Sequence, residues 1–164
     1  MSEANSHQPP RVLASLVVGA NGASSLAGAS AGLATPEDRG RFLALRKSQE
    51  ISAILVGART ATIEPYQKTP HPLYIYRRES GLTPRQYLES INRKHTGAIL
   101  CEGGITLIHQ LLHDGCIDIF HLTRVAIEGD GHFLDENLLN RTMALISREI
   151  VNQTTFEKYE RASR

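Results

Sequence analysis

Several features that would place a protein in a special class are missing from this sequence. It has only two cysteines, Cys101 and Cys116, which form no disulfide scaffold and indicate a reducing cytosol. Its 18 Lys plus Arg nearly balance 17 Asp plus Glu, for a net charge of +1, so it has no general attraction to nucleic acid or an anionic membrane. No apolar run approaches the roughly 18 residues that cross a bilayer, and the polar first ten residues form no secretory signal. We therefore expect a cytoplasmic protein without nucleic-acid or membrane partners.

The composition that is present is that of an ordinary globular protein. Hydrophobic residues make up 41% of the 164 residues, which is enough for one well-filled core. Residues 1–10, with Pro9 and Pro10, are expected to form a disordered tail. Residues 11–164 are expected to form a single domain.

The order of apolar runs and helix-start signals predicts an α/β sheet. Thr35-Pro36 and Thr83-Pro84 each combine a capping threonine with proline at the first helical position, so helices are predicted at 35–48 and 83–94. In the first of these helices, Phe42 and Leu45 are expected to face the core. A third helix is predicted at 105–114. Strands are predicted at 11–18, 52–56, 72–76, 97–101, 117–127, 143–151 and 155–159. The early strands alternate with helices and should pair in parallel, whereas the last ones lack crossover helices and should pair antiparallel.

In such sheets, ligands bind beyond the carboxyl ends of the strands. That rule nominates four segments: the small-residue loop at 19–34, the segment from Gly57, the pair Arg77-Arg78, and Glu102-Gly103-Gly104. The residues alone do not decide whether each segment binds a ligand or has only a structural role. The two glycines can let phosphate oxygens approach backbone N–H groups or form a plain turn. The two arginines can bind a phosphate or lie on a solvated surface.

Other kinds of chemistry find no support in the sequence. It has no G-x-G-x-x-G or Walker motif, no G-x-S-x-G elbow and no zinc-deaminase signature. His109 and His113 stand one helical turn apart, but Gln110 occupies the place of the glutamate in H-E-x-x-H, so no metal site is expected. Because no side chain identifies itself as a catalyst, the pattern fits an enzyme whose cofactor carries the chemistry.

Three segments in the same order resemble the pyrimidine reductases of riboflavin biosynthesis, the reductase domain of the bifunctional deaminase-reductase. ILVGARTATIEPY, from Ile54 to Tyr66, is similar to the family's L-V-G-A-x-T-V-x-x-E-x-Y. LCEGGITLIHQLL, from Leu100 to Leu112, resembles L-x-E-G-G-P-x-L-x-x-x-L. The stretch from Gly28 to Arg46 parallels a G-R-S-G-G-L segment followed by a helix that ends in Leu-Arg. The resemblance extends from about Arg11 to Tyr159.

The resemblance implies a three-layer α-β-α fold of the dihydrofolate-reductase type and a dependence on NADPH. It also implies that the ribosyl side chain of a phosphoribosylamino-pyrimidine is reduced to ribityl by hydride transfer. The implied substrate-binding residues are Asn21, Ser30, Arg46 and Glu102, with Arg46 as a clamp for the ribose phosphate. The implied cofactor-binding residues are Gly32, Gly57, Thr60, Glu64, Arg78, Gly103, Gly104, Ile105, Thr106 and Leu107, with Arg78 at the 2′-phosphate. A homodimer formed through the late strands is also expected.

The sequence departs from the family pattern in several places. Asn21 replaces an Asp, Ala29 an Arg, and Ile105 a Pro, and only ESGL stands between Arg78 and Thr83, where the family inserts a further strand. A second hypothesis is therefore a degenerate, shortened relative that binds a nucleotide, or serves as an interaction protein, without catalysis. A reductase for another substrate, such as a pterin, is a third.

Overall fold

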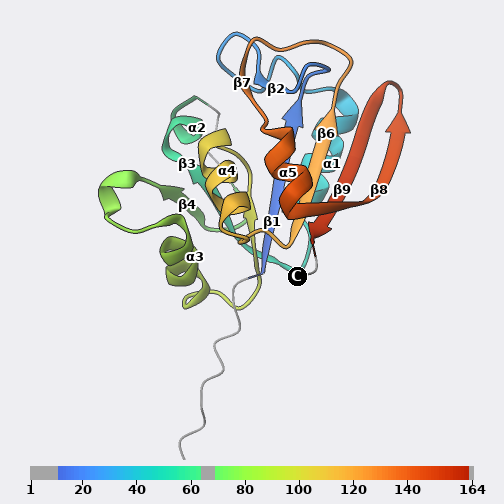
Figure 1. The fold of residues 1–164 in the computed structure, drawn as a ribbon. Coiled ribbons are helices and arrows are strands. Elements are labelled where there is room, and N and C mark those ends of the chain that lie inside the picture. Colours follow the sequence, from blue (N-terminus) through green and yellow to red (C-terminus); the bar gives the residue numbers. More distant parts are fainter. Residues whose placement is uncertain (1–10, 64–68, 163–164) are drawn as a thin grey trace, which may run out of the picture.

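A seven-stranded sheet forms the centre of the computed structural model, which describes residues 11–63 and 69–162. The strand order is β4-β3-β5-β1-β6-β9-β8 (Figure 1). The strands are β1 (Val12–Val18), β3 (Ile51–Gly57), β4 (Leu73–Tyr76), β5 (Ala98–Cys101), β6 (Ile119–Arg124), β8 (Met143–Val151) and β9 (Thr154–Arg161). The first five in spatial order pair in parallel, and β9 is antiparallel to both β6 and β8. This confirms the predicted mostly parallel sheet with antiparallel C-terminal strands.

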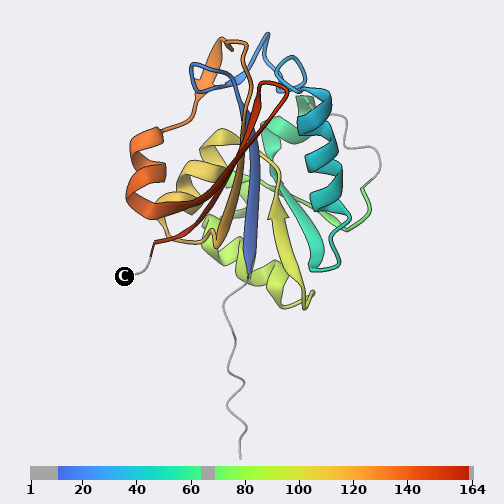
Figure 2. The same cartoon turned by 90° about the vertical axis from the view of Figure 1, so that its right-hand side faces the viewer.

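Helices cover both faces of the sheet and complete the predicted three layers. Helix α1 (Pro36–Arg46) lies on one face, and α3 (Pro84–Asn92), α4 (Ile105–His113) and α5 (Glu136–Thr142) lie on the other (Figure 2). The predicted helix starts are confirmed. The Thr35 hydroxyl accepts a hydrogen bond from the Asp38 N–H at 3.1 Å, and Thr83 forms a capping box with Gln86. No helix within the described residues is long and apolar enough to cross a membrane.

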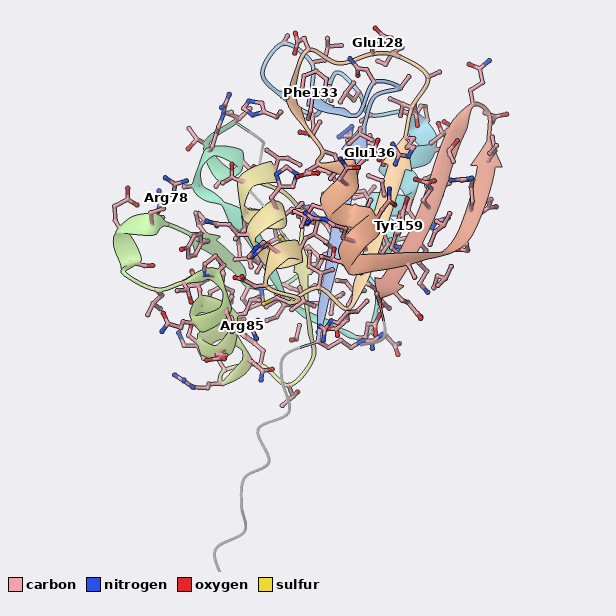
Figure 3. The ribbon with its side chains drawn as sticks, viewed as in Figure 1. Arg78, Arg85, Glu128, Phe133, Glu136 and Tyr159 are labelled. Atoms are coloured by element: carbon pink, nitrogen blue, oxygen red, sulfur yellow. The ribbon has the colours of Figure 1, made fainter. Side chains whose placement is uncertain are left out.

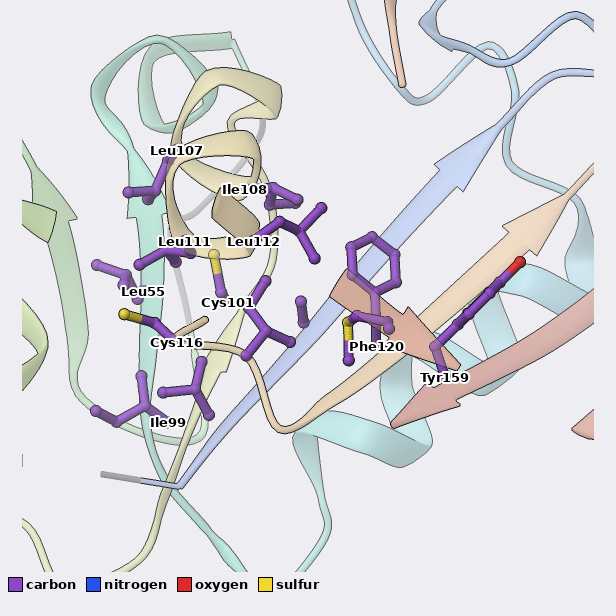
Figure 4. Close-up of a cluster of buried hydrophobic side chains, with 14 of the residues drawn as sticks. Leu55, Ile99, Cys101, Leu107, Ile108, Leu111, Leu112, Cys116, Phe120 and Tyr159 are labelled. Atoms are coloured by element: carbon purple, nitrogen blue, oxygen red, sulfur yellow. The ribbon is translucent and has the colours of Figure 1, made fainter. Parts of the chain in front are cut away.

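The main core lies between the sheet and helices α3, α4 and α5. Alternate strand residues such as Leu55 and Ile99 meet Ile108 and Leu111 of α4 there (Figure 4). Phe120 and Tyr159 extend this core toward β9 with an edge-on ring contact, 6.4 Å between centroids. The opposite face carries a second, small buried cluster: Leu13, Ile51, Ala98 and Leu100, with Leu45 and Ile119 packed against it.

Helix α1 differs from the prediction in one respect, because none of its residues is fully buried. Leu45 does pack against the small cluster, as expected. Phe42 is only half-buried and lines a pocket instead, with the Arg46 guanidinium 4.4 Å above its ring centroid. The expectation that Phe42 belongs to the core was therefore wrong. Amphipathic spacing places a side chain on the inner face of a helix, but it does not say whether that face meets packed side chains or a ligand site.

Four elements have no counterpart in the sequence prediction. Helix α2 (Ala58–Ile63) directly follows β3, and α5 stands in a stretch without a prediction. The other two are β2 (Ala23–Ser25) and β7 (Gly131–Phe133), which pair antiparallel. Strands of three residues are too short to show a period of two, so no local signal predicted them. The predicted strand at 117–127 is shorter, because β6 ends at Arg124. The short connection after β4 forms a single 3-10 turn, Arg78–Ser80.

Candidate functional site

A pocket of about 600 Å³ opens at the carboxyl ends of the parallel strands. Its wall is built from the last residues of β1, β3 and β4, the turn after β5, the inner side of α1 and the first turn of α4. This is the position at which open α/β sheets bind ligands. The loop at 19–34 also borders the pocket, through Ser24, Ser25 and residues 28–31.

Most of the residues singled out from the sequence meet in this pocket, although they come from segments far apart in the chain. The pocket-lining members are Ser30, Arg46, Gly57, Thr60, Arg78, Glu102, Gly103, Gly104, Ile105, Thr106 and Leu107. Asn21 and Gly32 are not among the described residues that line it. Glu64 lies outside the described residues. Figure 3 shows Arg78 just beyond β4, on the opposite side of the molecule from Tyr159.

The Gly103–Gly104 turn has a conformation that only glycine adopts without strain. Its φ angles are +141° and +85°, in the region that L side chains rarely occupy. The turn packs closely on the end of β3. A Cβ on Gly104 would come within 3.2 Å of the Gly57 Cα, and the Gly57 N–H donates to the Gly103 carbonyl at 3.2 Å. A bare backbone surface thus lies directly before the nine-residue helix α4, whose first N–H groups have no partner within the helix.

A buried ion pair joins this turn to α1. Arg46 donates from Nε to Glu102 Oε2 at 2.6 Å and from Nη2 to Glu102 Oε1 at 2.7 Å. The Glu102 side chain is 0% exposed and that of Arg46 is 13% exposed, so both charges are withdrawn from bulk water. A two-pronged pair of this kind fixes both side chains in position. Arg46, which was expected to bind the substrate's ribose phosphate, thus already has the Glu102 carboxylate along one edge of its guanidinium.

Three more arginines line the pocket, namely Arg39 from α1, Arg59 from α2 and Arg78 from the 3-10 turn. Unlike Arg46, none of them forms an ion pair with an acidic side chain of the described residues. Arg59 and Arg78 stand beyond the ends of the neighbouring strands β3 and β4. They give this end of the pocket a positive charge that suits a phosphate group.

Asp38 is a pocket residue that the sequence analysis did not select. As an acid in the first turn of α1, it favours the start of that helix. In the structure it lines the pocket, and burial raises its pKa, while a hydrogen bond with the Thr123 side chain acts in the opposite direction. Because Thr123 is 85 residues away in β6 (123 minus 38), no local pattern could have predicted this pair.

The loop at 19–34 is held over the pocket by residues near β7. The Asn21 side chain donates to the Gly129 carbonyl at 2.9 Å and accepts from the Gly129 N–H at 3.1 Å. The Asp130 carboxylate accepts from the Ala27 N–H at 3.0 and 3.2 Å, and the Ser24 hydroxyl donates to the His132 carbonyl. Asn21 therefore tethers the loop, and its expected contact with the substrate stays a prediction.

The remaining residues considered for chemistry are His109, His113 and Cys101, and their surroundings indicate no reactive role. His109 Nε2 accepts a hydrogen bond from the Asp135 N–H at 3.0 Å, and burial lowers the pKa of His109. His113 is largely exposed beside Asp114. Among the described residues, no three His, Cys, Asp or Glu side chains are placed to hold a metal ion together. Burial raises the pKa of the Cys101 thiol to about 12, which leaves it protonated and unreactive at neutral pH.

The strand order, the three layers and the site at the sheet's carboxyl edge define a fold of the dihydrofolate-reductase type. Comparison with solved structures supports this assignment. The chain is similar to a pyrimidine reductase-like protein from Corynebacterium diphtheriae, with a TM-score of 0.68, 18% identity, and coverage of 94% of this chain and 93% of that one.

It is also similar to a diaminohydroxyphosphoribosylaminopyrimidine deaminase/5-amino-6-(5-phosphoribosylamino)uracil reductase from Thermotoga maritima. There the TM-score is 0.68 and the identity 13%, over 94% of this chain and 57% of the longer one. A dihydrofolate reductase from Enterococcus faecalis, in complex with NADP(H) and RAB-propyl, matches with a TM-score of 0.60 and 16% identity, over 93% and 97% of the two chains. No protein-family model and no curated protein matches the sequence. At these identities the similarity establishes the fold.

Proposed function

We propose that this protein is an NADPH-dependent reductase of the pyrimidine-reductase type, which reduces the ribosyl side chain of a phosphoribosylamino-pyrimidine to a ribityl chain. The observation that carries the proposal is the bare Gly103–Gly104 turn, packed on Gly57 before the start of α4, in a pocket with arginines at its far end. The similarity in fold to reductases of this chemistry adds support.

The residues of the pocket fit a dinucleotide cofactor. Gly57, Gly103 and Gly104 have no side chain that would keep a diphosphate away from the backbone, and the free N–H groups at the start of α4 can donate to its oxygens. Arg78 supplies a positive charge for a 2′-phosphate, which favours NADPH over NADH. The Thr60 hydroxyl stands beside Gly103 and can bond the cofactor near the same turn.

NADPH, when bound, supplies the hydride. The chain then has to place the acceptor carbon against it and exclude water. Three groups on the α1 side of the pocket can hold the substrate in this way. They are the Phe42 ring for stacking, Ser30 for hydrogen bonding and Asp38, which burial favours in its protonated form by raising its pKa. The loop at 19–34, tethered by Asn21 and Asp130, lines this part of the pocket.

A nucleotide-binding protein without catalysis is the second candidate. Asn21, Arg46 and Glu102, which were expected to bind the substrate, already have protein partners, since Asn21 binds Gly129, and Arg46 and Glu102 bind each other. The chain is also short after β4, which leaves that strand at the edge of the sheet. Such a protein would bind NADPH but would not oxidise it in the presence of the pyrimidine.

We also propose that two copies of the chain associate through β8. This edge strand exposes three large apolar side chains, Leu145, Ile146 and Ile150, of which Ile150 is 67% exposed. Exposed apolar groups on an edge strand favour pairing with another chain. Light scattering should give the mass of a dimer for the wild type and a lower mass for Ile150→Asp. A monomeric wild type would refute this arrangement.

Calorimetric titration with NADPH and NADH tests the cofactor assignment. We expect micromolar binding of NADPH and weaker binding of NADH. Arg78→Ala should weaken NADPH about tenfold and leave NADH unchanged, as expected for the loss of one charge-assisted contact of about 1.4 kcal/mol.

Arg77→Ala is the matched control, because Arg77 is the exposed neighbour and is not among the described residues that line the pocket. Equal affinities for the two cofactors would exclude the 2′-phosphate assignment. If neither cofactor bound, the reductase proposal would be wrong. Binding of NADPH without its oxidation in the presence of the pyrimidine would favour the second candidate.

A further inference from the structure

Arg46 lies on the helix that borders the substrate side of the pocket, yet its ion pair connects it to the other side. Both hydrogen bonds to Glu102, at 2.6 and 2.7 Å, lead to the residue directly before the Gly103–Gly104 turn. The guanidinium also stacks on the Phe42 ring at 4.4 Å. Its position is thus fixed by protein groups before any ligand enters.

Glu102 requires this partner because its carboxylate is fully buried. An ionised carboxylate without a counter-charge is costly in such a place, so removal of one member of a buried pair is much worse than removal of both. The turn after Glu102 is packed on the end of β3: the Gly103 carbonyl accepts from the Gly57 N–H at 3.2 Å, and a Cβ on Gly104 would lie 3.2 Å from the Gly57 Cα. A shift of Glu102 would therefore disturb the contacts that hold the turn facing the cofactor.

We propose that Arg46 is a positioning residue for the cofactor end of the pocket: it holds the Glu102 carboxylate, and through it the Gly103–Gly104 turn, in the geometry that binds NADPH. This inference rests on the proposed function. It replaces the expected role of Arg46 as a clamp for the substrate's phosphate. It also makes an uncommon prediction, namely that a substitution on the substrate-side helix changes the affinity for the cofactor.

The test measures NADPH affinity as a function of pH. In Arg46→Gln, Glu102 loses both hydrogen bonds from the guanidinium and one positive charge beside its buried carboxylate, which makes protonation of that carboxylate more favourable. At pH 8 the carboxylate without these two bonds should displace the turn and weaken NADPH binding at least tenfold relative to the wild type. At lower pH, protonation of the carboxylate should remove the charge, and the ratio to the wild type should recover.

The NADPH affinity of each variant is compared with that of the wild type at the same pH, because the 2′-phosphate of the ligand itself titrates near pH 6 and affects all variants alike. The other charged groups around the pocket are also present in all Arg46 variants. Those in the described residues are Asp38, Arg39, Arg59, Arg78, Glu79 and His132. Arg39→Gln is the matched control, since Arg39 lies on the same helix and lines the same pocket but forms no ion pair with a described acidic residue. Its ratio should not depend on pH.

Two further variants separate positioning from folding. Arg46→Gln/Glu102→Gln removes both charges of this buried pair, so it should bind NADPH better than Arg46→Gln at pH 8 and show no pH-dependent ratio. Arg46→Lys keeps the charge but not the two-pronged geometry and should rescue binding in part. Loss of thermal stability in Arg46→Gln, with unchanged NADPH affinity at every pH, would overturn the proposal. A raised KM for the pyrimidine with unchanged NADPH affinity would also overturn the proposal, and would support Arg46 as a residue that binds the substrate's phosphate.

Hydrogen exchange of the unliganded protein keeps this test independent of the proposed function. The amides of Glu102, Gly57 and Ile108, which donate to the Leu55, Gly103 and Gly104 carbonyls, should exchange faster in Arg46→Gln than in the wild type and Arg39→Gln. If the wild type binds no NADPH, the reductase proposal fails, whereas faster exchange would still support the link between Arg46 and the turn. Unchanged exchange would refute that link whatever the cofactor does.

Discussion

The two faces of the sheet are covered by helices in very different ways. Toward α3, α4 and α5, the strands bury a continuous apolar core that includes Ile99, Ile108 and Phe120. Toward α1, the buried apolar residues form only a small cluster, and no residue of that helix is fully buried. The space left between α1 and the ends of the strands is the pocket. One face of the sheet thus stabilises the fold, and the other leaves room for a ligand.

The alternation of side chains along each strand explains how one sheet can do both. In β1, Val12 and Ala14 point into the main core, while Ser15 and Val17 line the pocket. At the β8–β9 end of the sheet, one charged pair on each face shows the same contrast. Glu157 is buried and bonded to Arg124 and Arg148, whereas Glu149 is exposed and lies 3.5 Å from Arg41.

The largest contrast between the faces should appear in core truncations. Phe120→Ala should lower the free energy of unfolding by about 3–5 kcal/mol, because the main core cannot collapse around the cavity. Leu45→Ala, in α1, should cost only about 1 kcal/mol, since this side chain is half-buried. Urea unfolding measures both. Equal losses would show that the α1 face is as tightly packed as the other.

On the pocket side, Gly104→Val should cause the greatest loss of binding. The φ of +85° and the 3.2 Å approach to Gly57 leave no place for a branched side chain. We expect at least tenfold weaker NADPH binding, which corresponds to about 1.4 kcal/mol or more. Gly40→Ala is the control, since no atom lies within 4 Å of its added Cβ and alanine favours a helix. It should keep the wild-type affinity. Unchanged binding by Gly104→Val would contradict the proposal that the Gly103–Gly104 turn binds the diphosphate of the cofactor.

Loss of the buried glutamate on the core face should have a pH-dependent effect. Burial alone would raise the pKa of Glu157, but hydrogen bonds from Arg124 and Arg148 outweigh it and the pKa is lowered. The charged form therefore stabilises the fold above the unfolded-state pKa of about 4.3, and this contribution is lost as the pH falls through the lower folded-state value.

Glu157→Gln should accordingly cost roughly 1–3 kcal/mol at pH 7, and the difference from the wild type should shrink below about pH 4. Glu149→Gln, on the exposed pair of the other face, should cost less than about 0.5 kcal/mol at any pH. Denaturant unfolding from pH 3 to pH 7 measures both. A loss that does not depend on pH would mean that the charge of Glu157 is not what stabilises the fold.

The smallest contrast concerns the helix caps. Thr35→Ala and Thr83→Ala should each cost about 1 kcal/mol, because each removes the cap of one helix. Only Thr35→Ala should also weaken ligand binding, by a few fold, since α1 lines the pocket and α3 does not. Thermal unfolding and NADPH titration of both variants check this. Equal effects on binding would remove the functional distinction between the two faces.

Local sequence patterns were sufficient for much of this fold. The starts of α1 and α3 follow from a capping threonine and a proline, and the buried strands follow from short apolar runs. The rule that ligands bind at the carboxyl ends of parallel strands led to Gly57, Arg78 and Gly103–Gly104, which do line one pocket. Each of these predictions depends on residues that are neighbours in the chain, where propensity and periodicity act directly.

The tertiary structure alone decided what several polar residues do. Arg46 and Glu102 are 56 residues apart, and Asn21 and Gly129 are 108 apart, so no local pattern shows that they are partners. The sequence determined that Arg46 would stand at the end of an amphipathic helix, but not whether that cation would meet a ligand or a buried carboxylate. The energy of a charge depends on the groups around it and on its exposure to water, and both are set only when distant segments pack together.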